Sequence, residues 1–219
     1  MTESAETWIA ELSQADLPEI VRVHIASFPS SASTRLGAEA VRRYYEWQFL
    51  APHDAHFLGG WVNGQLEGYC FCGTFRGAFA GFVARNRWFL VWQLFIRPRL
   101  WKHEEVRSAI FNAVRRFVQR ALPSESAAGS QPQSQRFGIL SIAVSPRCRS
   151  LGLGTLLMNE AERTARLRGV HVMGLTVNPS NGTAVRFYER LGWVRVSPNG
   201  LWSGRMEKTL IPLPGSQQS

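Results

Sequence analysis

Two short apolar runs, each followed by a helical pattern, mark the C-terminal half of the chain. The first run is Ile139–Val144, and the second is Val172–Val177. Short β-branched runs of this kind predict buried strands. After the first run, apolar residues recur at three- and four-residue spacing, as in an amphipathic helix: Leu153, Leu156, Leu157, Ala161 and Ala165. The second run is followed by Asn181, a helix-capping residue, and by Gly192, a typical helix stop. The pattern therefore predicts two strand–turn–helix units in tandem.

The N-terminal half predicts a strand, two helices and a hairpin. The strand spans residues 7–12, the helices span 15–27 and 38–49, and the hairpin strands are 56–62 and 65–74. Asn63-Gly64 joins the hairpin strands, because these residues tolerate the positive φ angles of a two-residue turn. The first helix has a predicted buried stripe of Leu17, Ile20, Val21, His24 and Ile25. His24 is thus predicted to be a packed histidine rather than a catalyst.

Residues 85–122 interrupt this order before the strand at Ile139. Residues 85–102 are aromatic and basic, and a helix is predicted over 104–122. The uncharged run 88–96 is about nine residues long, against the roughly twenty that span a bilayer. It predicts either a helical pair packed on the sheet, which we favour, or a peripheral contact with a membrane surface.

The remaining segments complete a single domain over residues 1–213. Residues 123–135 lack apolar anchors and predict a mobile loop, residues 194–196 and 201–210 predict closing strands, and 214–219 predict a disordered tail. One core suits a chain of 219 residues in which 45% are hydrophobic. No signal peptide is evident at Met1, so we expect a cytoplasmic protein.

Charge and cysteine content narrow the function classes. The formal net charge of +9 favours anionic partners, but no nucleic-acid-binding signature accompanies it. Cys70, Cys72 and Cys148 suit a reducing compartment. His53 and His56 precede the Cys70/Cys72 pair, yet a Cys-x-Cys strand more often packs than binds zinc, so we expect no metal.

The turn after the first apolar run has the chemistry of an anion site. Gly152 and Gly154 let a backbone approach a ligand closely, and the first helical turn presents amide N–H groups that the helix does not use. The helix dipole favours negative charge at the same place. Arg147 and Arg149 add side chains that bind phosphate oxygens. These residues predict a pyrophosphate site.

Both units together resemble the GNAT superfamily of acyl-coenzyme A-dependent N-acetyltransferases. The first matches the family signature at Val144–Pro146 and Arg149–Gly154, and the second matches it from Asn181 to Trp193. The resemblance covers roughly the last two-fifths of the chain strongly. It implies an α/β (α+β) fold, in which a mixed central sheet is flanked by helices and the aromatic, basic segment is a helical insertion before the cofactor-binding strand.

The resemblance also implies which residues bind acetyl-CoA. Backbone groups of Ile142, Ala143 and Val144 would pair with the pantetheine amides, and Asn181 would contact the pantetheine or phosphate portion. The pyrophosphate turn would consist of Arg149, Ser150, Leu151, Gly152, Leu153, Gly154 and Thr155. Tyr188 would protonate the departing coenzyme A thiolate. Acetyl-CoA would be the acyl donor, and an amine would be the acceptor.

One departure from the family leaves the general base open. Thr176 stands where the ribosomal-protein acetyltransferase branch has a glutamate, and threonine is not a base at neutral pH. A water chain, Glu46, Asp54 or Glu67 are the alternatives. The acceptor could be a small molecule, an amino sugar or a protein N-terminus. In the family the loop between the first two helices helps to wall the acceptor site, so residues 28–37 are either an acceptor-recognition segment or an ordinary polar loop. A homodimer is a further expectation. A membrane-surface or ligand-binding protein that keeps the fold without transferase activity is the alternative function.

Overall fold

The structure is a computed structural model that describes residues 6–96, 136–197 and 200–211. Its contacts fall into two compact units. The sheet unit comprises residues up to Leu12, His53–Phe75 and the chain from Gln135 onward, and the helical unit comprises Ser13–Pro52 and Arg76–Ser134. The predicted single domain over 1–213 stays a prediction. The predictions for residues 97–135, including the helix 104–122 and the mobile loop 123–135, and for the tail 214–219, lie outside the described residues.

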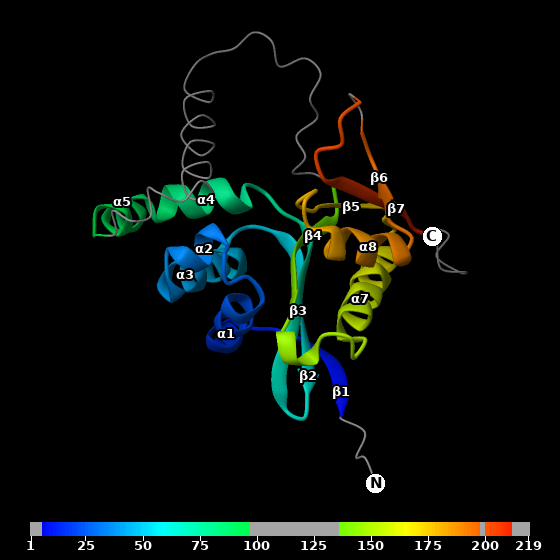
Figure 1. Ribbon diagram of the computed structural model, residues 1–219, viewed down its shortest axis with the longest axis horizontal. Helices are drawn as coiled ribbons and strands as arrows, with labels where there is room; N and C mark the ends of the chain where they lie inside the picture. The colour runs from blue at the N-terminus through cyan, green and yellow to red at the C-terminus, as the bar shows by residue number, and fades with distance from the viewer. Residues whose placement is uncertain (1–5, 97–135, 198–199, 212–219) are drawn as a thin grey trace. The chain divides into compact units, whose positions relative to one another are not determined.

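Seven described strands form one mixed sheet in the sheet unit (Figure 1). All neighbouring strands are antiparallel except β4 and β5, which are parallel. In spatial order the strands are β1 (Thr7–Glu11), β2 (Asp54–Val62), β3 (Gln65–Thr74), β4 (Gly138–Val144), β5 (Val172–Thr176), β7 (Arg205–Thr209) and β6 (Val194–Arg195). The mixed α/β fold class that the sequence predicts is confirmed.

The β2–β3 hairpin forms where the sequence predicts it. Asn63 and Gly64 have φ angles of 48° and 76°, and they connect the paired residues Val62 and Gln65. Glycine and asparagine adopt such angles at low cost, which explains why the chain turns there. β2 begins two residues earlier than predicted, at Asp54.

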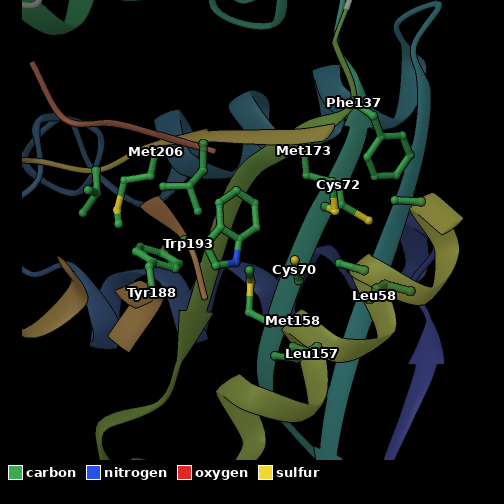
Figure 2. Packing of buried hydrophobic residues seen from close by; sticks show 14 of the residues in the cluster. Leu58, Cys70, Cys72, Phe137, Leu157, Met158, Met173, Tyr188, Trp193 and Met206 are labelled. Atoms are coloured by element: carbon green, nitrogen blue, oxygen red, sulfur yellow. The ribbon is translucent and has the colours of Figure 1, made fainter. Parts of the chain in front are cut away.

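Helix α7 (Leu153–Leu167) packs on β1–β4 through its apolar stripe. A Cβ atom at Gly60 of β2 would lie 2.7 Å from Leu153 Cδ1, so the glycine lets the helix approach the strand closely. Figure 2 shows side chains of the buried cluster to which α7 contributes, among them Met158 of α7 itself, Cys70 of β3 and Trp193. This packing fixes the first turn of α7 relative to the strands.

Helix α8 (Gly182–Arg190) begins and ends as predicted. The Asn181 side chain accepts a hydrogen bond from Ala184 N at 3.1 Å, and Gly192 has a φ angle of 83°. Val185 and Tyr188 face the core that α8 shares with α7.

The closing strands are shorter than the predicted 194–196 and 201–210. β7 begins at Arg205 because the chain turns just before it: Gly204 has a φ angle of 96°, and Trp202 Nε1 donates to Arg205 O at 2.6 Å. A side chain at Gly204 would collide with the carbonyl of Val177, so the turn needs glycine.

The described part of the helical unit contains five α-helices. They are α1 (Leu17–Ser27), α2 (Ala32–Arg35), α3 (Ala38–Leu50), α4 (Ala78–Arg85) and α5 (Arg87–Ile96). The first starts two residues later than predicted, after a 3₁₀ turn over Gln14–Asp16. Pro18 explains the delay, since a helix beginning at Ala15 would place this residue, which has no N–H, beyond the first turn.

Two details of the helical unit differ from the predicted pattern. Val23 rather than Val21 is fully buried on α1, and Ile25 is half-buried. The predicted insertion at 85–122 is helical in its described part, but helix begins already at Ala78. Asn86 separates α4 from α5, donating to Phe82 O at 3.1 Å and accepting from Arg43 at 3.3 Å. None of the described helices is long and apolar enough to cross a membrane.

Candidate acyl-CoA site

The connection between β4 and α7 is fastened to β3. Ser145 N donates to Glu67 O at 2.7 Å, and Cys148 N donates to Ser145 O at 2.9 Å, closing a 3₁₀ turn over Pro146–Cys148. Cys148 is buried beneath the turn. These bonds fix the position of the backbone before Arg149, and so they also fix where the turn of residues 149–152 begins.

Left-handed backbone then leads into the helix. Ser150 and Gly152 have φ angles of 69° and 80°, and Leu156 N is the first amide to bond within α7, to Gly152 O at 3.0 Å. The amides of residues 153–155 precede that bond and are not used by the helix itself. No heavy atom lies within 4 Å of a Cβ built at Gly152, so this position needs glycine for its conformation and not for space. The turn thus presents the N–H cluster expected for an anion site.

Gly154 has a different role from Gly152. A Cβ built there would lie 3.4 Å from Phe187 Cζ and 3.7 Å from Val144 Cγ2, which are ordinary contact distances. Gly154 therefore lies where the start of α7 meets α8 and the end of β4. The two sequence motifs come together at this point, and the ring of Phe187, which the sequence did not single out, lies between them.

The two arginines of the turn are not equivalent. Arg147 donates to both Glu67 carboxylate oxygens, one of them from Nε at 2.9 Å, and to Gln65 Oε1 at 2.8 Å. Glu67 is buried, with 2% of its surface exposed, and its negative charge neutralises the positive charge of Arg147 in this ion pair. Arg149 is exposed, as is Arg147, and it directly precedes the left-handed residue Ser150 of the turn.

Strands β4 and β5 form the shortest ladder along this part of the sheet. In the described residues that ladder consists of one pair, Gly138 with Gly174, whereas β4 pairs with β3 over the full length from Gly138 to Val144. The close approach at the pair requires glycine, because a Cβ at Gly138 would collide with Gly174 O. The sequence-predicted pantetheine residues Ile142, Ala143 and Val144 lie beyond that pair, at the end of β4 next to α7.

Tyr188 lies in the core formed by α7, α8 and β3. It is 8% exposed, its ring centroid is 6.2 Å from that of Trp193, and both labelled side chains lie beside Met158 in Figure 2. Burial, together with the nearby Cys70, raises the pKa of the phenol above its usual range. The group is therefore protonated at neutral pH and can donate a proton. It has no hydrogen-bond partner among the described residues.

The three carboxylates considered as a base are all in ion pairs. Glu67 binds Arg147, Glu46 binds Arg42 at 3.1 Å, and Asp54 binds Arg168. Thr176 is exposed at the end of β5. The Glu67–Arg147 pair joins residues 80 positions apart, and no local sequence signal could have revealed it.

Two other sequence predictions can be placed. His24 is buried as predicted; its Nδ1 lies 2.9 Å from Tyr45 Oη and its Nε2 lies 3.0 Å from Ser33 Oγ. Ser33 belongs to α2, within the loop predicted to recognise an acceptor. Cys70 and Cys72 are free thiols in the core, and the described residues contain no group of three metal-ligating side chains.

The family is established by comparison with known sequences. A model of the acetyltransferase (GNAT) family matches residues 17–193, so the chain belongs to this family. A comparison with curated proteins finds no significant match.

Solved structures share the fold at low sequence identity. The ribosomal-protein-S18-alanine N-acetyltransferase from Escherichia coli is 15% identical, with a TM-score of 0.55 over 98% of this chain and 99% of that one. The Paia N-acetyltransferase from Thermoplasma acidophilum, solved with coenzyme A, is 15% identical, with a TM-score of 0.55 over 93% and 99%. Ard1 from Thermoplasma volcanium is 17% identical, with a TM-score of 0.52 over 94% and 98%.

Proposed function

We propose that this acetyltransferase moves the acetyl group of acetyl-CoA to a primary amine and uses the β4–α7 turn to bind the pyrophosphate. The observation that carries the proposal is the cluster of unused amides at residues 153–155, in the first turn of α7, which follows the left-handed residues Ser150 and Gly152. Helix N-termini of this kind bind phosphate through N–H groups and the helix dipole. Ile142, Ala143 and Val144 would bind the pantetheine arm, and Asn181 would contact it through the amide group that also caps α8.

Tyr188 is proposed as the general acid. The amine attacks the thioester carbonyl only when neutral, so it must lose a proton, and the C–S bond then breaks to release a thiolate. The Tyr188 phenol supplies a proton to that sulfur. Burial raises its pKa, which keeps the phenol protonated over the pH range in which amines become neutral but also makes it a weaker acid.

The base is proposed to be water rather than a carboxylate. Glu67 already accepts two hydrogen bonds from Arg147, so its carboxylate oxygens are engaged with a charged partner. Glu46 and Asp54 are likewise paired with arginines. Thr176 has no suitable group. Acceptor identity, cytoplasmic residence and a homodimer remain predictions, and so does contact of residues 85–102 with a membrane.

Replacing Tyr188 by Phe tests the proposal. The ring and its packing remain, so coenzyme A affinity measured by calorimetry should stay within about twofold, while the single-turnover rate with an amine panel should fall roughly a hundredfold. Tyr44→Phe, which also removes only a phenol hydroxyl from a partly buried ring, is the matched control. Full transfer by Tyr188→Phe would refute the acid role. Binding of coenzyme A without transfer to any amine by the unaltered protein would support the alternative, a ligand-binding protein.

A further inference from the structure

Helix α5 in the helical unit carries an exposed apolar stripe. Trp88, Val91, Trp92 and Phe95 recur at spacings of three, four and seven residues, and therefore share one face. Their exposed fractions are 74%, 57%, 59% and 78%. Large apolar side chains scattered singly over a surface are ordinary, but four on one helical face form a continuous patch. Here this patch is called the α5 stripe.

The opposite side of α5 is held by the unit itself. The guanidinium of Arg43, on α3, lies 4.3 Å from the centroid of the Phe89 ring and also donates to Asn86 Oδ1 at 3.3 Å. Glu39 accepts a hydrogen bond from Arg43 Nε at 2.7 Å and so fixes the arginine. These contacts hold α5 on the side away from the stripe, and in the part of the chain that the structure describes the stripe faces outward.

Charge around the α5 stripe selects the kind of partner. Arg85 ends α4 and Arg87 begins α5, with the Arg87 guanidinium 5.6 Å from the centroid of the Trp88 ring. Neither helix contains an acidic side chain. A second copy of the chain would bring two such segments together, and like charges would oppose the contact. An anionic surface would be attracted by the same residues.

We propose that the α5 stripe docks in the interface of an anionic lipid bilayer. Aromatic and aliphatic side chains flanked by arginine and lysine are the composition of helices that lie in the plane of the headgroups. Tryptophan favours that depth because its ring is apolar and its N–H is polar. A helix of ten residues is about 15 Å long, half the hydrocarbon thickness, so α5 would lie flat and not span the bilayer. This docking does not depend on acetyl transfer.

Vesicle co-sedimentation of the full chain tests the docking. The unaltered protein should pellet with vesicles of phosphatidylcholine plus phosphatidylglycerol, should bind pure phosphatidylcholine at least about tenfold more weakly, and should be released as salt is raised. Trp88→Ser/Trp92→Ser/Phe95→Ser should lower the partition coefficient by about a hundredfold or more, because three large apolar groups no longer enter the lipid. The matched control, Val194→Ser/Leu201→Ser, removes exposed apolar groups from the sheet unit and should bind as the unaltered protein does.

Two further measurements keep the outcomes distinct. Thermal unfolding monitored by circular dichroism should be unchanged in the triple variant, and brominated lipids should quench the fluorescence of the unaltered protein much more than that of the variant. Equal vesicle binding by the triple variant, or equal binding to both lipid compositions, would overturn the proposal. A concentration-dependent dimer in ultracentrifugation that the triple substitution abolishes, without vesicle binding by the unaltered protein, would assign the stripe to self-association and overturn it as well.

Discussion

The β4–α7 turn exposes backbone groups to its surroundings, whereas helix α5 exposes apolar side chains. In the turn, the apolar side chains of Leu153 and Cys148 are buried, and backbone amides are left over at the helix start. In α5, the backbone is bonded within the helix and apolar side chains face outward. The first region therefore depends on backbone conformation, and the second depends on side-chain identity. Substitutions should affect the two in different ways.

The largest expected effect concerns the stability of the helical unit at low pH. Burial lowers the pKa of His24 to about 4 from 6.5. His24 binds a proton below about pH 6.5 in the unfolded chain but only below about pH 4 in the folded chain. The free energy of unfolding therefore falls as the pH is lowered from 6.5 to 4. The full loss is about 3 kcal/mol.

Denaturant unfolding of the unaltered protein and of His24→Gln checks this linkage. Between pH 7 and pH 4.5 the unaltered protein should lose about 2 kcal/mol more of its free energy of unfolding than His24→Gln does, because glutamine does not titrate. A difference that is the same at both pH values would show that His24 does not govern the acid response.

A smaller effect is expected where α7 meets the sheet. Gly60→Ala places a methyl group 2.7 Å from Leu153 Cδ1 and should destabilise the sheet unit by about 2 kcal/mol through overpacking. Gly174→Ala is the matched control, since no heavy atom lies within 4 Å of its new Cβ. Equal unfolding midpoints for the two variants would contradict the close packing of α7 on β2.

Coenzyme A affinity should respond to the conformation of the turn. Gly152→Val forces a β-branched residue into a φ angle of 80°, which strains the backbone and should weaken binding about tenfold in calorimetry. Gly154→Ala adds a methyl group at ordinary contact distance and should change affinity by less than about threefold. The reverse order of the two effects would mean that space at Gly154, and not conformation at Gly152, limits binding.

The smallest effect is expected from the pair that fastens the turn. Glu67→Gln weakens the hold on Arg147 and should raise the dissociation constant of coenzyme A about threefold, with an unchanged pH profile of the transfer rate. If Glu67 were the base, this isosteric change would instead nearly abolish transfer and remove a limb of the profile.

The sequence predicts this molecule well wherever the signal is local. Asn63-Gly64, Asn181 and Gly192 each adopt the turn or cap that their own chemistry favours, and the strands and helices between them follow. Helix α1 begins two residues later than the periodicity predicts, because Pro18 outweighs the helical pattern. Strand β7 is shorter than predicted, because the chain turns at Gly204.

Long-range features of the candidate site could not be predicted. The Glu67–Arg147 pair, the Phe187 ring against Gly154 and the single β4–β5 pair all join residues far apart in the sequence. Each depends on how the strands align or how the helices α7 and α8 pack, and periodicity specifies neither. The sequence left open whether residues 88–96 are packed or exposed, because a helix apolar on both faces suits either environment.

Hydrogen–deuterium exchange with and without coenzyme A tests the central claim most directly. The amides of residues 153–155 are not bonded within α7, so they should exchange quickly in the free protein and slow markedly when phosphate oxygens accept from them. Peptides covering residues 142–155 should be protected, while those covering α4 and α5 should exchange as before. Unchanged exchange over residues 150–155 at saturating coenzyme A, or protection confined to α4 and α5, would contradict the account.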